Sequence, residues 1–233
     1  MTMVQERMEI NAQEGPRRLP LVPVFQAAEL VNAITHGIGL VLSVVGAIVL
    51  IARPQSQGDA HLVVGCTLFS MPLIAVYAAS TLSHAPLRPR LRHLFRRLDQ
   101  GFIYLLIVGT GMPFALVYLR TGWWFLFFGL MWTVALCGFV SKTLFSHRVE
   151  AVAIWSYVLL AWIAIATVPS LLKLVPAAAL WWMLVGGLCY TCGTLFLACD
   201  KRYPLFHGLW HMFVIVGSTC HFLTILFFVV DSP

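Results

Sequence analysis

Long apolar runs dominate the chain, and short polar breaks separate them at regular intervals. A membrane helix needs about 20 predominantly apolar residues. Runs that meet or nearly meet this length are Val31–Ala52, His61–Ser83, Asp99–Leu119, Trp123–Ser141, Ala151–Leu172, Pro176–Cys199 and Phe206–Val230. The breaks between them hold Arg, Lys, Asp, Pro or Gly. The pattern predicts an all-α integral membrane protein, a bundle of seven transmembrane helices.

The basic residues indicate how this bundle is oriented. Loops on the cytoplasmic side of a membrane protein carry an excess of Lys and Arg. Three of the 15 basic residues, Arg53, Arg120 and Lys173, fall on the side opposite the N-terminus, which leaves twelve on the N-terminal side. The distribution predicts a cytoplasmic N-terminus and an external C-terminus. Seven helices, an odd number, likewise require the two ends to lie on opposite sides.

The polar parts of the chain are too short to form a separate soluble domain. The longest of them is roughly the first 28 residues, which contain no apolar segment of the kind found in a cleavable signal peptide. We therefore expect a cytoplasmic N-terminal segment at residues 1–28 and one seven-helix transmembrane domain at residues 29–233.

Composition supports a membrane protein and excludes other classes. Hydrophobic residues make up 60% of the chain and charged residues 10%, whereas soluble domains carry about 25% charged residues. The net charge of +6 does not indicate nucleic-acid binding, because most basic residues sit in short loops between apolar runs. The six cysteines lie within apolar spans or at their inner edges, which argues against a disulfide framework. We expect the protein in the cell (inner or plasma) membrane, surrounded by lipid.

Ionisable residues gather at one end of the predicted bundle. His84 closes the second predicted helix, Asp99 opens the third, and His207 and His211 open the seventh. Because the second helix runs inward and the other two run outward, all four residues reach the cytoplasmic end. Ionisable side chains at membrane depth are costly and are candidates for function.

The spacing of the histidines favours a metal site. His207 and His211 are four residues apart, so they share one helical face with their Cβ atoms about 5–6 Å apart. With His84 they supply three protein ligands and leave one position open, which is the pattern of catalytic zinc. The alternative is that these histidines only bridge helices by hydrogen bonds. Asp99 could likewise be a helix cap or an ion-pair partner, and Ser80 a packing hydroxyl.

Other histidines have weaker claims to the site. His36, near the inner end of the first predicted helix, could support the ligands from behind. Glu29, two turns earlier, could pair with His36 or with a basic loop. His221 lies 14 residues beyond His207, about 21 Å further along the helix, so it cannot ligate the same ion. A haem held by that pair would need a second helix with a matching pair, and the sequence contains none.

Three blocks of sequence resemble one known family. They are Glu29-Leu-Val-Asn-Ala-Ile-Thr-His-Gly37, the segment from Ser80-Thr-Leu-Ser-His84 through Arg97-Leu-Asp99 to Pro113-Phe114, and His207-Gly-Leu-Trp-His211 through His221-Phe222. In this order they resemble the haemolysin III family, which belongs with the adiponectin and progestin receptors and, more distantly, with the alkaline ceramidases.

The resemblance implies seven helices, a cytoplasmic N-terminus and zinc bound by His84, His207 and His211, with water as the fourth ligand. It further implies that Asp99 holds this water and that Ser80 lies one turn below His84. The chain departs from the family pattern at Gln100, where members often have His, and at Gly111-Met112, where they often have Tyr-Thr. Neither departure touches an expected ligand, but both alter the expected cavity wall.

Two classes of function fit these features. The first is a zinc-dependent hydrolase of a lipid amide, in which Asp99 transfers protons and Ser80 donates to the developing oxyanion. A site inside the bundle, reached from the bilayer, would suit such a substrate. The second is a non-enzymatic receptor or regulator of membrane homeostasis with a structural or signalling zinc. A cytolytic protein is a weaker alternative, because no continuous polar stripe crosses the predicted bundle.

Overall fold

The computed structural model describes residues 21–120, 122–145, 150–203 and 205–231. Residues 1–20, most of the expected N-terminal segment, lie outside the described residues. Within the described ranges the chain is helical and contains no strand. Long helices satisfy the hydrogen bonds of their own backbone, which is the condition for crossing a lipid bilayer.

Seven described helices are long and apolar enough to cross a membrane, which confirms the predicted fold class. The protein is therefore an integral membrane protein. The elements are α2 (Leu21–Gln57), α3 (Ala60–His84), α4 (Pro89–Tyr118), α5 (Trp124–Leu144), α6 (Glu150–Ile163), η2 (Ala164–Thr167), α7 (Val168–Leu171), α8 (Ala177–Cys199), α9 (Phe206–Ile225) and η3 (Leu226–Val230). The segments α6, η2 and α7 follow one another as the fifth span, and η3 continues α9 as a π-helical turn.

Two helices begin well before the apolar runs that predicted them. Helix α2 begins at Leu21 rather than Val31, and α4 begins at Pro89 rather than Asp99. Proline is favoured at the first position of a helix, and the Arg and Leu residues that follow Pro89 are good helix formers. The apolar runs therefore mark where each of these helices becomes apolar enough to enter the membrane, and not where the helix begins.

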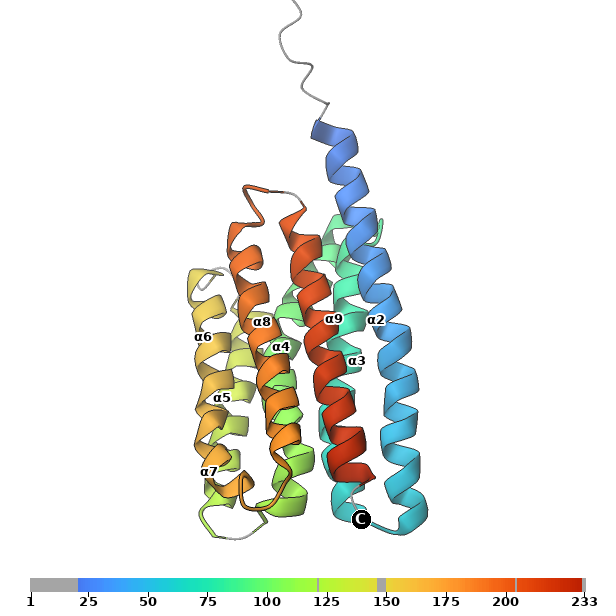
Figure 1. Ribbon diagram of the computed structural model, residues 1–233. Helices are drawn as coiled ribbons and strands as arrows, with labels where there is room; N and C mark the ends of the chain where they lie inside the picture. The colour runs from blue at the N-terminus through green and yellow to red at the C-terminus, as the bar shows by residue number, and fades with distance from the viewer. Residues whose placement is uncertain (1–20, 121, 146–149, 204, 232–233) are drawn as a thin grey trace, which may run out of the picture.

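The first and last helices lie side by side and close the bundle (Figure 1). Helix α9 packs against both α8 and α2, while α3 packs between α2 and α4. Gly109 of α4 permits the close approach of α3, since a Cβ atom there would overlap the carbonyl oxygen of Leu68. This tight packing brings the end of α3 close to the first half of α4.

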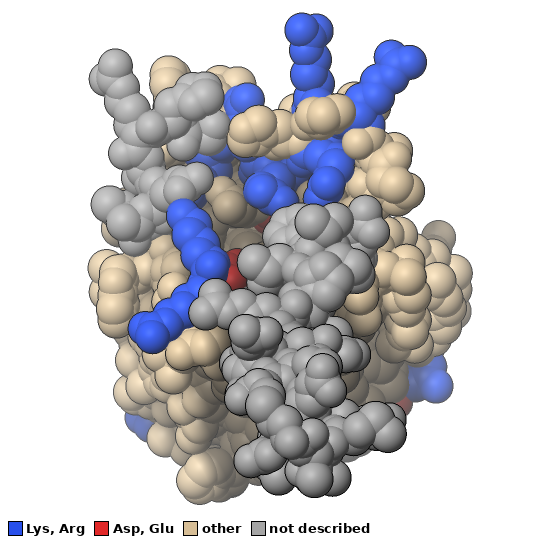
Figure 2. Space-filling view, turned by 90° about the horizontal axis from the view of Figure 1, so that it is seen from above, with Lys and Arg blue, Asp and Glu red and all other residues tan. Residues whose placement is uncertain are grey.

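The two ends of the bundle differ in character. The basic end is where α3 and α8 finish and where α4 and α9 begin. Lys and Arg side chains protrude from this face, as Figure 2 shows. The opposite end carries exposed Trp123 and Trp181, which suit the boundary between lipid and water. There, Arg53 also pairs with Asp231 at 2.6 Å and links α2 to the end of η3.

We expect Met1 and Pro233 to lie on opposite sides of the membrane, with Met1 on the cytoplasmic side. The physical reason is the excess of basic residues on the N-terminal side. Fusions of each end to green fluorescent protein and to alkaline phosphatase measure the location, because the first fluoresces inside the cell and the second is active outside. Finding both ends on one side would refute the seven-span topology.

Candidate metal centre

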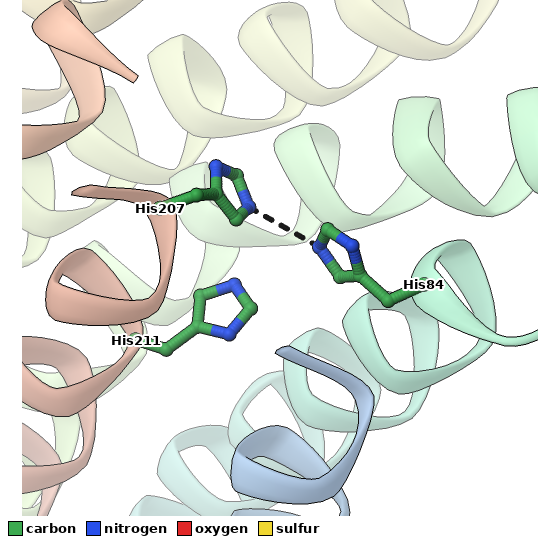
Figure 3. Close-up of side chains that lie close together, drawn as sticks. All are labelled: His84, His207 and His211. Carbon is green, nitrogen blue, oxygen red and sulfur yellow. Dashed lines mark hydrogen bonds between the residues drawn. The ribbon is translucent and has the colours of Figure 1, made fainter. Parts of the chain in front are cut away.

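Three histidines from two distant parts of the chain meet at the basic end. His84 is the last residue of α3, and His207 and His211 lie in the first turns of α9. One ligand atom from each lies within 4.8 Å of the others. The ring centroids are 4.9, 5.2 and 4.7 Å apart, so the rings form a nearly equilateral triangle (Figure 3). This histidine cluster could bind a metal ion.

The local sequence explains why His84 stands at a helix end. Pro86 disfavours helical backbone at the residue before it, and Ala85 is extended, with φ −68° and ψ 156°. Helix α3 therefore ends at His84. The carbonyl of Ser83, near this end, accepts a hydrogen bond from Arg92 Nε at 3.1 Å. The imidazole is thus held at the end of a rigid helix and not on a loop.

Carboxylates fix two of the three rings. The Nδ1 atom of His84 lies 3.1 Å from Glu29 Oε2, and that of His207 lies 2.8 Å from Asp200 Oδ2. A carboxylate only accepts hydrogen bonds, so each Nδ1 carries the proton and each neutral ring has its lone pair on Nε2. Arg92 donates to the same Glu29 oxygen at 2.5 Å and steadies it. Histidines that bind metals commonly have such partners behind them.

The third ring, that of His211, is held at Nδ1 by a hydroxyl group instead of a carboxylate. His211 is fully buried, and its Nδ1 lies 3.3 Å from Thr35 Oγ1. The Thr35 hydroxyl donates its own proton to the main chain at Val31 or Asn32, so it accepts from His211. The other nitrogen, Nε2, is buried without a hydrogen-bond partner among the described residues. An unpaired buried polar atom costs about 1–3 kcal/mol, which a metal bond would offset.

The spacing of the nitrogens fits a metal ion. Nε2 of His84 and Nε2 of His207 lie 3.2 Å apart. Two ligands on a tetrahedral ion with metal–nitrogen bonds of about 2.0–2.1 Å lie about 3.3–3.4 Å apart. Two facing lone pairs repel unless a cation or a proton lies between them. An all-imidazole set of donors suits zinc, copper, iron or nickel.

Asp99 and Ser80 lie next to the cluster without belonging to it. Ser80, one turn before His84, is fully buried, and its hydroxyl has no hydrogen-bond partner among the described residues. It faces the carboxyl group of Asp99 on α4. Asp99 is not among the three residues whose ligand atoms converge. Its carboxyl group therefore lies beside the histidine cluster and is not one of the converging ligand atoms.

His36 supports the cluster from α2. Its ring stacks on that of His211, with centroids 3.4 Å apart and planes at 21°. Both of its nitrogens are buried without a hydrogen-bond partner among the described residues. Glu29 was expected to pair with His36 or with a basic loop. The structure contains the second pairing, through Arg92, and Glu29 also contacts His84.

Three supporting residues were not identified from the sequence. They are Arg92, which holds Glu29, Asp200, which holds His207, and Thr35, which holds His211. Asp200 reaches its partner across the turn between α8 and α9, whereas Arg92 and Thr35 each contact a residue of another helix. Asp200 lies seven residues before His207, a spacing that carries no helical signal because a turn separates the two.

A cavity of about 230 Å³ lies inside the bundle beside the cluster. Its wall comes mainly from α4, α6, α8 and α9, and most of the lining side chains are apolar. Asp99, His36 and Trp210 are among the lining residues. His36 stacks on His211, and Trp210 comes directly before His211 in the sequence. The part of the cavity lined by His36 and Trp210 therefore reaches the back of the histidine cluster.

Comparisons with known proteins identify relatives that match most of the chain. The family model described as "Haemolysin-III related" matches residues 26–222. The chain is 36% identical to "Hemolysin-3" of Bacillus cereus over 210 residues, covering 89% of this chain and 94% of that protein. It is 34% identical to the "Hemolysin-3 homolog" of Bacillus subtilis (strain 168) over 205 residues, covering 88% and 96%. It is also 24% identical to the human "Monocyte to macrophage differentiation factor" over 216 residues, covering 87% and 84%.

We expect the purified protein to hold about one metal ion per chain and His211→Ala to lose most of it, because two imidazoles make a poor site. Elemental analysis of detergent-purified protein measures this. His61→Ala is the matched control, since His61 is exposed at the opposite end. Full metal content in His211→Ala would show that His211 is not a ligand.

We also expect Asp200→Ala to weaken metal binding by about 10–100-fold while the ion can still bind, because His207 loses the partner that fixes its tautomer. Competition with a chelator measures the affinity. Asp59→Ala is the control: it removes a carboxylate that caps α3 at the opposite end. Equal affinities in the two variants would contradict a role for Asp200 behind the metal.

Proposed function

The chain belongs to the haemolysin III family, and from this and the geometry of the histidine cluster we propose that it is a zinc-dependent hydrolase of a lipid amide. One observation carries the proposal. Three imidazoles converge with their Nε2 atoms available, beside a carboxyl group that opens onto an apolar cavity. Three protein ligands and an open position are typical of catalytic zinc, whereas structural sites are usually closed by four.

The cavity supports an apolar substrate. Side chains such as Leu106, Phe114 and Leu184 line it within the membrane-spanning part of the bundle. An acyl chain in this space would bring the polar head of a lipid towards Asp99. Burial of the chain against such walls would contribute about 25 cal/mol per Å² of apolar surface. A lipid amide held this way presents its carbonyl to the cluster.

Each residue near the cluster has a role in hydrolysis. Zinc, when bound, lowers the pKa of a water ligand towards about 7 and polarises a carbonyl group. Asp99 accepts a proton from the attacking water and passes it to the departing amine. The Ser80 hydroxyl, which has no other described partner, donates a hydrogen bond to the oxyanion that forms. Glu29, Asp200 and Thr35 keep the three rings in the tautomer that leaves Nε2 free.

A regulator is the second candidate. The name of the human relative, "Monocyte to macrophage differentiation factor", describes a cellular effect and no reaction. It favours a receptor or regulator of membrane homeostasis in which zinc serves structure or signalling. The name "Hemolysin-3" suggests a third candidate, a cytolytic protein. The position of the histidine cluster at one end of the bundle gives this candidate less support.

We expect Asp99→Asn to keep its zinc and to lose amide hydrolysis by on the order of 10²-fold or more, the scale of a lost general base. The amide keeps the size of the side chain but cannot take up the proton. The measurement is fatty-acid release from a panel of long-chain N-acyl amides, by mass spectrometry, alongside metal analysis.

His61→Ala, at the far end of the bundle, should hydrolyse at the wild-type rate and serves as the control. If wild-type protein with full zinc releases no fatty acid from any amide, the regulator becomes the better explanation. If Asp99→Asn loses zinc together with activity, Asp99 acts as a ligand or orients one, and its role as a base is refuted.

A further inference from the structure

One histidine lines the cavity far from the histidine cluster. His221 lies on α9, ten residues beyond His211, and the helix between them is continuous. Ten residues of helix span about 15 Å. The His221 side chain is buried, lines the cavity, and makes no hydrogen bond to a described residue. It lies too far along the helix to take part in binding the same ion.

The position of this imidazole is fixed by a hydrogen-bonded group of neighbours. Its ring stacks on Tyr190 of α8, with centroids 5.5 Å apart and planes at 23°. Ser218 donates its only hydroxyl proton to the carbonyl of Val214, so it accepts from both Tyr77 at 3.0 Å and Tyr190 at 2.8 Å. The Tyr190 ring is therefore fastened, and the imidazole lies against a rigid surface.

A glycine makes room for the ring. A Cβ atom on Gly186 of α8 would lie 2.7 Å from His221 Nε2, a distance that would force the imidazole to move. Leu184, Gly187 and Val214, which also line the cavity, carry no polar side-chain group that could pair with the imidazole. The imidazole is thus accommodated and held in place, yet it makes no hydrogen bond to a described residue.

An unpaired imidazole in an apolar cavity needs an explanation, because burying a polar group without a hydrogen bond costs free energy. Ionisable groups at membrane depth mostly face a cavity or a substrate path. His221 faces the cavity, so a molecule that enters the cavity can supply the hydrogen-bond partner that no described side chain provides.

We infer that His221 is a second binding point for the ligand of this cavity. It forms a hydrogen bond with a hydroxyl or carbonyl group within the ligand's apolar chain, about 15 Å along α9 from His211. The inference rests on the proposed function, which supplies the lipid amide. It narrows the substrate class to long-chain amides that carry a second polar group partway along the chain.

The test compares two probes, a saturated long-chain primary amide and the same molecule with one hydroxyl at mid-chain. Binding of each radiolabelled amide is measured on full-length, zinc-loaded protein in lipid nanodiscs. All proteins carry Asp99→Asn so that the amides stay intact. We expect the hydroxylated amide to bind several-fold to about tenfold more tightly, as for one net hydrogen bond.

Two variants assign this preference to His221. His221→Phe keeps a ring of similar shape and should abolish the preference without weakening the plain amide. Gly186→Ala removes no polar group but displaces the imidazole, so it should also reduce the preference. Metal content shows that each variant is folded, because the histidine cluster lies far along α9. His61→Phe should keep the full preference.

Equal binding of the two amides by the Asp99→Asn protein, or an unchanged preference in His221→Phe, would overturn the inference. Failure of both amides to bind would overturn it as well. Failure of the proposed function has a different signature: protein with Asp99 intact would release no fatty acid, whatever preference the binding assay gives.

Discussion

The arrangement at the basic end depends on two imidazole lone pairs that face each other. Nε2 of His84 and Nε2 of His207 lie 3.2 Å apart, and the carboxylates behind the rings assign both protons to Nδ1. Two such lone pairs repel unless a cation or a proton lies between them. The partners of the rings come from α2 and from the turn after α8, while the rings themselves belong to α3 and α9. A metal at this point would fasten four segments of the bundle, including its first and last spans.

The membrane explains why this polar group is confined to one place. In lipid, every polar group needs a partner within the protein, so polar side chains are costly along most of each helix. The histidine cluster lies at the basic end, where Arg92 can reach from the water-exposed side to hold Glu29. Deeper in the bundle, Tyr77, Tyr190 and Ser218 satisfy one another. His221 departs from this rule, and its position on the cavity wall gives a ligand two different polar points along one apolar space.

Much of the candidate site could be predicted because His84 and His207 lie at helix ends and Asp99 lies where α4 becomes apolar. The direction in which each helix crosses the membrane places His84, Asp99 and His207 at one depth, and a spacing of four places His211 beside His207. The partners behind the rings could not be found in this way. Asp200 and Thr35 reach their histidines across a turn or between helices, and such contacts leave no periodic trace in the sequence.

Hydropathy and charge therefore determined the number of spans, the fold class and the gathering of histidines, because each depends only on composition and on the alternation of direction along the chain. The tertiary structure decided what depends on how helices pack. It stacked His36 on His211 and left the Ser80 hydroxyl and His211 Nε2 without a hydrogen-bond partner among the described residues. It also opened a cavity beside Asp99 and turned His221 towards it. These outcomes depend on how closely helices approach each other, as Gly109 of α4 approaches α3. The distance between two helices is set by both of their surfaces together, so the sequence of one helix cannot specify it alone.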